Sequence, residues 1–279
     1  MAILSTQCAK KYSPGIDIEL VVDATTNESL TGYRGTICNY VDKIHVIDIT
    51  AKNNAFISRI LKTKLRTYIT GDYLYIDIDA VPVTNLDAVF STKCQIGMAY
   101  DLDKPSDIVQ HIDPDGTIYS EGNWVLPEKY FNSGVMLARD TPEVHDFFEA
   151  WHSTWKTYTE SGLHIDQPSL NEIIQHSNID IVELAPEWNA CIGRTTKSRG
   201  LKHPKIYHYF TLRFDTRNDT QFINIVKDMK INQVINWDLV NKIIASKYPW
   251  TDKNSIRLHW MSGNYKMALK LFVNKFIRS

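Results

Sequence analysis

Asp77 and Asp79 follow the apolar residues 74–76 and are separated only by Ile78. Side chains alternate between the two faces of a strand, so both carboxylates are expected on the same face. Adjacent carboxylates repel each other unless protons or a cation neutralise them, and a divalent cation with oxygen ligands does so directly. The pattern predicts a metal site at the end of a strand. The alternative is a pair that only begins a turn, but residues 80–83 (AVPV) are too apolar for an ordinary solvated turn.

The bulk composition is that of a globular protein with a sizeable core, because 43% of the 279 residues are apolar and 23% are charged. A net charge of −1 provides no basic field, so no nucleic-acid partner is expected. The four cysteines show no metal-binding or redox spacing, and the chain has neither a signal-peptide pattern nor a membrane-spanning apolar run. We therefore expect a cytoplasmic protein with reduced thiols. The many Ile, Lys and Asn residues are typical of AT-rich genomes such as those of giant viruses, for which the host cytoplasm or the virion would be the location.

Short β-branched segments alternate with segments that carry apolar residues at helical spacing. This alternation predicts an α/β fold with a mostly parallel central sheet flanked by helices. Strands are expected at residues 16–22, 43–49, 73–77, 95–100 and 133–137, and helices at 55–70 and from Thr141 onward.

The segments without clear periodicity organise the rest of the chain. Residues 104–128 are polar and rich in turn residues, which favours a long loop or hairpin that either binds an acceptor or only decorates the surface. We expect a catalytic domain at residues 1–215 and a helical extension at 216–279 packed on it. The basic, amphipathic residues 265–278 either form a last helix packed on the domain, the more common arrangement, or lie on an anionic membrane.

Three more segments accompany the aspartate pair along the chain. They are FNSG at residues 131–134 before a strand, DQPSLN at 166–171 at a helix start, and HY at 208–209 at a strand end. In this order the four segments resemble the GT-A glycosyltransferases, most closely retaining glycosyltransferase family 8, which includes glycogenin and bacterial lipopolysaccharide galactosyltransferases. The resemblance runs over about residues 16–208 and fades after them.

The resemblance implies a GT-A fold and transfer of a hexose, glucose or galactose, from a UDP-sugar to a glycan, protein or lipid-linked acceptor. Asp77, Asp79 and His208 would hold the metal, and this mixed oxygen and imidazole set suits Mn²⁺ and tolerates Mg²⁺. The cation would neutralise the departing diphosphate. Transfer with retention would pass through an oxocarbenium-like state, with double displacement through Asp166 as the alternative.

The resemblance also implies the other site residues. Asp166 and Gln167 would face the anomeric carbon as the catalytic pair, and Asp101 and Asn132 would orient the sugar. Gly134 lacks a side chain, so the backbone there could approach a ligand. The complete donor-binding set is Arg59, Tyr75, Asp77, Ile78, Asp79, Asp101, Asn132, Ser133, Gly134 and Arg213.

Simpler structural roles compete with several of these assignments. Asp166 or Gln167, which precede Pro168, could only cap a helix. For Arg59 the alternative is an exposed position on a lysine-rich helix, and for His208 it is a core histidine with a satisfied hydrogen bond. The FNSG segment could be an ordinary strand-entry turn.

Two departures from the family pattern affect nucleotide binding. The family usually continues after the HY pair to a Lys-Pro-Trp segment whose lysine binds the diphosphate, and here only Arg213 offers a substitute cation. Residues 16–23 match the second strand of the family, and residues 1–12 look like the helix before it. We therefore expect no counterpart of the first strand and its base-binding loop in residues 1–23, which predicts weak nucleotide binding.

Two other functions fit part of the pattern. A haloacid-dehalogenase-type phosphatase also begins with an apolar strand and DxD, but it needs a later acidic pair that this sequence does not provide. A degenerate GT-A domain that binds sugar nucleotide without turnover would explain the two departures. The intact metal-binding set favours the enzyme.

Overall fold

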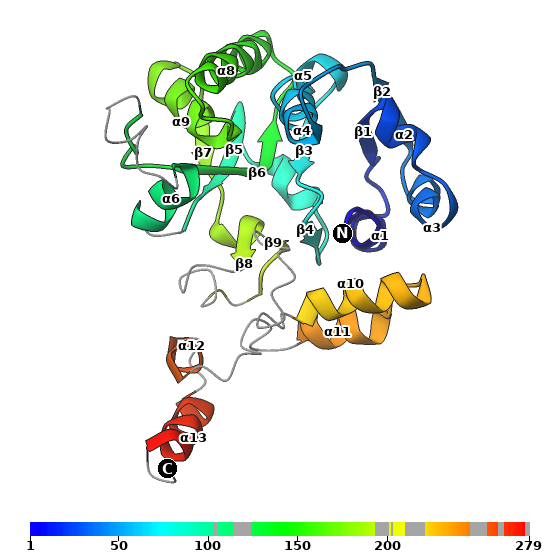
Figure 1. Cartoon of the computed structure of the whole chain (residues 1–279), viewed down its shortest axis with the longest axis vertical. Helices are drawn as coiled ribbons and strands as arrows, with labels where there is room; N and C mark the ends of the chain where they lie inside the picture. Colours follow the sequence, from blue (N-terminus) through cyan, green and yellow to red (C-terminus); the bar gives the residue numbers. More distant parts are fainter. Residues whose placement is uncertain are drawn as a thin grey trace.

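The structure is a computed structural model of the chain, and it describes residues 1–102, 105–113, 124–192, 201, 203–209, 221–245, 256–261 and 265–276. A four-stranded sheet forms its centre and is flanked by helices (Figure 1). The strand order is β3 (Tyr73–Ile76), β6 (Phe131–Ala138), β5 (Ile96–Tyr100) and β7 (Ile181–Glu183). Strands β3, β5 and β6 agree with expected positions, whereas β7 was not predicted.

All eight residues of β6 are buried, because the sheet is covered on both faces. Met136 and Ala138 pack in one apolar cluster with aromatic side chains of α8 (Pro142–Glu160). The alternate residues Val135 and Leu137 belong to a second cluster on the other face. The period of two therefore appears in the apolar second half of the strand, residues 135–138.

The expectation of a mostly parallel sheet is corrected by β6, which runs antiparallel to both β3 and β5. Only the β5–β7 pair of this sheet is parallel. The chain reaches β6 after the long excursion that begins at residue 101, and not through one helical crossover. The handedness rule for strand–helix–strand units therefore does not govern its direction.

Two smaller sheets extend the structure. The parallel pair of β1 (Glu19–Asp23) and β2 (Lys43–Ile47) lies at one edge, as the alternation of elements predicts. A three-stranded sheet has the order β4 (Ala80–Pro82), β9 (Ile206–Tyr209) and β8 (Ala190–Ile192). Because β4 follows β3 directly, the turn at residues 77–79 connects the central sheet to the three-stranded one.

The helix expected at residues 55–70 is present but interrupted at Lys64, which separates α4 (Asn54–Thr63) from α5 (Leu65–Tyr68). The loop expected at residues 104–128 is also partly helical, since α6 covers Pro105–Ile112. Ile108 and Ile112 lie one turn apart and are buried with Trp124 and other apolar residues. This small core explains why helix replaces loop in a polar segment.

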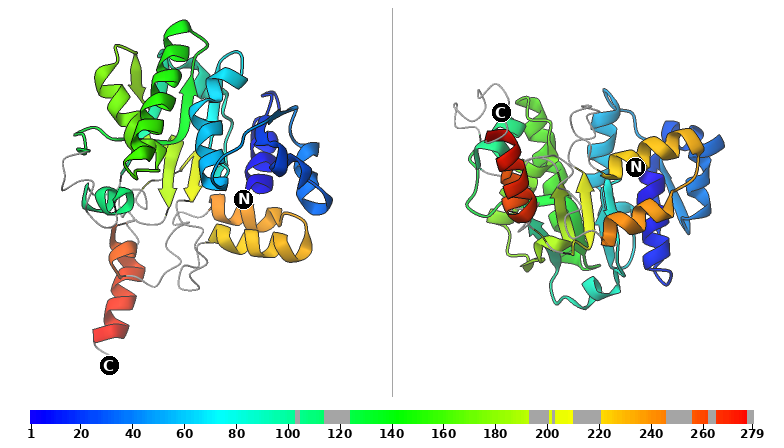
Figure 2. Two further views of the ribbon diagram at one scale, coloured as in Figure 1. Left: turned by 45° about the horizontal axis from the view of Figure 1, so that its top comes forward. Right: turned by 90° about the horizontal axis from the view of Figure 1, so that it is seen from below.

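The first helix packs against two helices from a much later part of the chain. Leu4 and Cys8 of α1 (Ala2–Tyr12) share an apolar cluster with residues of α10 (Gln221–Asn232) and α11 (Trp237–Ala245). Figure 2 shows α10 and α11 beside α1, whereas α13 (Tyr265–Phe276) projects from the body. The remaining helices are α2 (Ala24–Glu28), α3 (Gly32–Gly35), α9 (Asp166–His176) and α12 (Ile256–Met261). Within the described ranges, none of the helices is long and apolar enough to cross a lipid bilayer.

Candidate active site

Asp77 and Asp79 lie in the turn between β3 and β4, where backbone hydrogen bonds hold them. The Asp77 N–H donates to the Gly134 carbonyl at 2.8 Å, and the Ala80 N–H donates to the Asp77 carbonyl at 2.9 Å. Ile78 between them is 67% exposed, whereas about a quarter of each carboxylate side chain is accessible. The turn therefore directs its apolar residue outward and both acids inward.

His208 completes a cluster of three ligand-type side chains. It is buried in β9, the middle strand of its sheet, and its Nε2 lies 3.4 Å from Asp79 Oδ1 and 3.8 Å from Asp77 Oδ2. One ligand atom from each residue falls within 4.8 Å of the others. Cis ligands at bond lengths near 2.1 Å stand roughly 3 Å apart, so these atoms fit one divalent cation after small side-chain adjustments.

The electrostatics of the cluster favour an ionised Asp79. Burial alone would raise the pKa of this carboxyl group, but the hydrogen bond and charge of His208 hold its pKa below the usual value. Tyr75 donates its hydroxyl hydrogen to Asp77, and burial raises the pKa of the tyrosine well above its ordinary value. The site therefore combines an ionised Asp79 with a tyrosine that stays protonated.

Gly134 makes room for the His208 ring. A Cβ on Gly134 would lie 2.1 Å from His208 Cε1 and 2.7 Å from its Nδ1. The space left by the missing side chain is thus occupied by the imidazole, and not by a ligand as the FNSG segment suggested. This glycine therefore positions His208.

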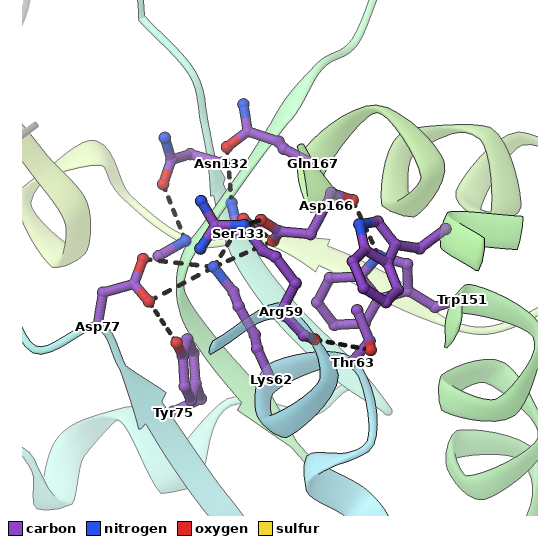
Figure 3. Close-up of polar contacts among 12 residues, drawn as sticks. Arg59, Lys62, Thr63, Tyr75, Asp77, Asn132, Ser133, Trp151, Asp166 and Gln167 are labelled. Atoms are coloured by element: carbon purple, nitrogen blue, oxygen red, sulfur yellow. Dashed lines mark hydrogen bonds and ion pairs between the residues drawn. The ribbon is translucent and has the colours of Figure 1, made fainter. Parts of the chain in front are cut away.

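A second cluster joins α4 to α9 next to the carboxylate pair (Figure 3). Lys62 Nζ lies 3.3 Å from Asp77 Oδ2, 3.2 Å from Asp166 Oδ2 and 3.0 Å from Ser133 Oγ. Arg59 Nε lies 2.7 Å from Asp166 Oδ1. Sequence reasoning missed Lys62 and treated it as part of an exposed basic face, although it is only 5% exposed. Its spacing of three from Arg59 was the available signal, because residues three apart share a helix face.

Asp166 is the first residue of α9, and its side chain faces the two cations. Its Oδ2 also accepts a hydrogen bond from Ser133 Oγ at 3.0 Å, and its carbonyl accepts one from Trp151 Nε1 at 3.0 Å. Burial alone would raise the pKa of Asp166, but Lys62 and Arg59 hold it below the usual carboxyl value. The helix begins after Ile165 and this first turn has no side-chain cap, so Asp166 serves the cluster and does not cap the helix.

Three polar residues continue the site beyond Ser133. Asn132 Nδ2 and Gln167 Nε2 each donate to Asp101 Oδ2 at 3.1 Å. Gln167 Oε1 accepts from the Ser133 N–H at 3.2 Å. The amides and carboxylate that sequence reasoning assigned to the sugar thus form one connected group, beside the cation cluster.

The sequence-predicted residues within the described ranges converge on this region. Arg213 lies outside the described residues. A buried asparagine, Asn189, also contacts His208 and Asn132 and was missed, because a single amide after a short turn carries no distinctive pattern.

The geometry can now be set beside known proteins. A sequence model described as nucleotide-diphospho-sugar transferase matches residues 21–231. This chain belongs to that family. The predicted GT-A fold is confirmed, and the transferase has the mixed sheet flanked by helices described above.

Solved structures with a similar arrangement share little sequence with this transferase. Apo mouse xyloside xylosyltransferase 1 is 16% identical with a TM-score of 0.48, and the match covers 75% of this chain and 91% of that one. Galactosyltransferase LgtC, in complex with donor and acceptor sugar analogs, is 16% identical with a TM-score of 0.49 over 76% and 83% of the two chains. Apo WbbM, a bifunctional glycosyltransferase, is 14% identical with a TM-score of 0.49 over 75% and 44%. No curated protein sequence matches the transferase.

Proposed function

We propose that this transferase is a metal-dependent, retaining hexosyltransferase of the family 8 type, which moves glucose or galactose from a UDP-sugar to an acceptor. The observation that carries the proposal is the contact between two clusters. A three-residue cation site at Asp77, Asp79 and His208 adjoins two basic residues of α4, the buried Lys62 and the partly exposed Arg59. A diphosphate leaving group requires positive charge of this kind.

Each part of the site has a role in this reaction. Asp77, Asp79 and His208 would hold Mn²⁺ or Mg²⁺, which when bound neutralises the charge of the leaving diphosphate. Asp101 and the amides of Asn132 and Gln167 offer donors and acceptors to sugar hydroxyls. We take residues 1–215 as the catalytic domain.

The partners of Asp166 bear on how configuration is retained. Both of its oxygens are engaged, one by Arg59 and the other by Lys62 and Ser133, and the side chain is 3% exposed. A carboxylate held in this way is a poor nucleophile, because attack would break its ion pairs. We therefore favour front-side transfer, in which Asp166 stabilises the oxocarbenium-like charge, over double displacement through Asp166.

The acceptor is proposed to be lipid-linked, and the observation behind this is the surface of α13. Tyr265, Leu269, Phe272 and Phe276 form one stripe along the helix and are between 46% and 63% exposed. The helix contains three lysines and no acidic residue. An aromatic stripe on a basic helix matches the surface of an anionic membrane.

Metal-dependent donor turnover tests the main proposal. The full chain is incubated with Mn²⁺ and a panel of sugar nucleotides, and released UDP and transferred sugar are measured. Release is expected with a UDP-hexose and is expected to be lost with EDTA or in Asp79→Asn. Asp146→Asn, which changes an exposed acid on α8, is the matched control.

Binding without turnover is the second candidate, motivated by the missing Lys-Pro-Trp segment. Calorimetry with UDP-hexoses separates the two. Mn²⁺-dependent binding with no UDP release from any donor would replace the enzyme with the binding function. Release that is equal in wild type and Asp79→Asn would overturn the metal site.

A further inference from the structure

Asn189 contacts His208 at Nδ1, the ring nitrogen that does not face Asp77 and Asp79. It ends the short helical turn Pro186–Asn189 before β8 and is 2% exposed. Its Oδ1 lies 2.8 Å from His208 Nδ1, and its Nδ2 lies 2.9 Å from Asn132 Oδ1. Both ends of the amide are thus engaged by residues of the proposed site.

The backbone fixes the orientation of both amides. The Gly134 N–H can only donate, and it lies 2.9 Å from Asn132 Oδ1, so the oxygen of Asn132 must face it. That oxygen can only accept, so Asn189 must present its NH₂ group to Asn132. The oxygen of Asn189 is therefore left facing His208.

We infer that Asn189 is a positioning residue that sets the tautomer of His208. An amide oxygen facing Nδ1 requires the hydrogen on Nδ1, so a neutral ring carries its lone pair on Nε2. Nε2 is the atom that faces Asp79 and Asp77. A histidine binds metal through such a lone pair, and a hydrogen bond from its other nitrogen fixes the ring.

The same amide connects the cation site to the proposed sugar-binding residues. The chain of hydrogen bonds runs from His208 through Asn189 and Asn132 to Asp101. Cys191 Sγ lies 3.7 Å from His208 Nδ1, and a thiol is a much weaker acceptor than an amide oxygen. Asn189 is therefore the group suited to orient the ring. The inference rests on the proposed metal site.

Two substitutions separate the contacts of Asn189. Asn189→Asp keeps an oxygen for His208 Nδ1 but removes the donor to Asn132, whereas Asn189→Leu removes both. Mn²⁺ affinity of the full chain is measured by electron paramagnetic resonance. We expect Asn189→Leu to weaken Mn²⁺ binding by about 10- to 100-fold and Asn189→Asp to retain it within a few-fold. Asn178→Leu, at an exposed position, is the control.

The tautomer is read directly from the wild-type chain. Two-dimensional ¹H–¹⁵N NMR of the imidazole, at a pH where the ring is neutral, should show His208 protonated on Nδ1 without any metal. A ring protonated on Nε2, or unchanged Mn²⁺ affinity in folded Asn189→Leu, would overturn the inference. Because the spectrum is recorded on the wild-type chain, it tests the inference even if Asn189→Leu fails to fold. Loss of the metal proposal is recognised separately, because Asp79→Asn would then bind Mn²⁺ as wild type does.

Discussion

The ammonium group of Lys62 lies 3.2 Å from the carboxylate of Asp166, and both side chains are at most 5% exposed. The pair joins α4 to the start of α9 across the end of β6. Buried ion pairs contribute little net stability when intact, but removing one partner leaves an uncompensated charge. Substitution of one partner should therefore lower the free energy of unfolding more than substitution of both partners.

Lys62→Met is expected to lower the free energy of unfolding by about 3–5 kcal/mol, because Asp77 and Asp166 lose a shared buried cation. Adding Asp166→Asn should restore part of that loss, since it removes a buried carboxylate that Arg59 alone then neutralises. Urea denaturation of the four members of this double-mutant cycle measures the coupling. Lys93→Met, at an exposed position, is the control, and additive effects of the two substitutions would contradict the pairing.

Gly134→Ala is expected to displace the His208 ring, because the new Cβ would lie 2.1 Å from Cε1 on a strand buried on both faces. Overpacking of this kind costs about 1–3 kcal/mol, and metal binding should weaken with it. Gly97→Ala on β5 is the matched control, since its Cβ would come no nearer than 3.1 Å to its closest neighbour, Leu184. Thermal unfolding and Mn²⁺ titration check both variants. Equal Mn²⁺ affinity in the two would show that the ring does not depend on Gly134.

His152 is expected to make the protein less stable as the pH falls from 6.5 to 4. Burial, with smaller effects of Lys64 and Lys156, lowers the pKa of His152 from 6.5 to about 4. Within this window the unfolded chain binds the proton and the folded chain does not, so stability is lost toward acid. The slope is below about 1.4 kcal/mol per pH unit, because the ring is only partly buried.

His152→Gln should flatten that pH dependence, measured by urea denaturation at several pH values. The variant keeps a polar group near Thr63 Oγ1, which lies 2.8 Å from His152 Nδ1. His176→Gln, at an exposed position on α9, should leave the slope unchanged. An unchanged slope in His152→Gln would exclude His152 as its source.

The stripe on α13 is expected to bind vesicles that contain phosphatidylserine and to ignore vesicles of phosphatidylcholine alone. Leu269→Asp with Phe272→Asp should abolish sedimentation with the vesicles, and added salt should weaken it, because lysines supply part of the attraction. Ile231→Asp on α10 is the control, since that side chain is 79% exposed on another helix. Failure of the wild type to bind either vesicle would remove the membrane from the proposal.

The sequence predicted those parts of the site that depend on local pattern. The apolar segment before Asp77 forms β3, and the helix start at Asp166 forms α9. Local pattern also located the strand that carries His208. These elements depend on periodicity and on the residue types of short segments, and both can be read from a single sequence.

Features of the structure that depend on long-range packing were not predicted from the sequence. The direction of β6 depends on how the excursion before it folds, and that information is not periodic. The burial of Lys62 depends on Asp166 and Ser133, which belong to other elements. A basic residue on a helix with several others is usually exposed, so the prediction named Arg59 and omitted Lys62.

The three-residue cation site also bears on the stability of the fold, because its residues come from two different sheets. Asp77 follows β3 of the central sheet, whereas Asp79 precedes β4 and His208 lies in β9 of the other sheet. A cation shared by all three would tie the two sheets together in the folded chain. Metal loading should therefore raise the temperature at which the two sheets separate, and the same ion that assists departure of the diphosphate would strengthen the scaffold around it.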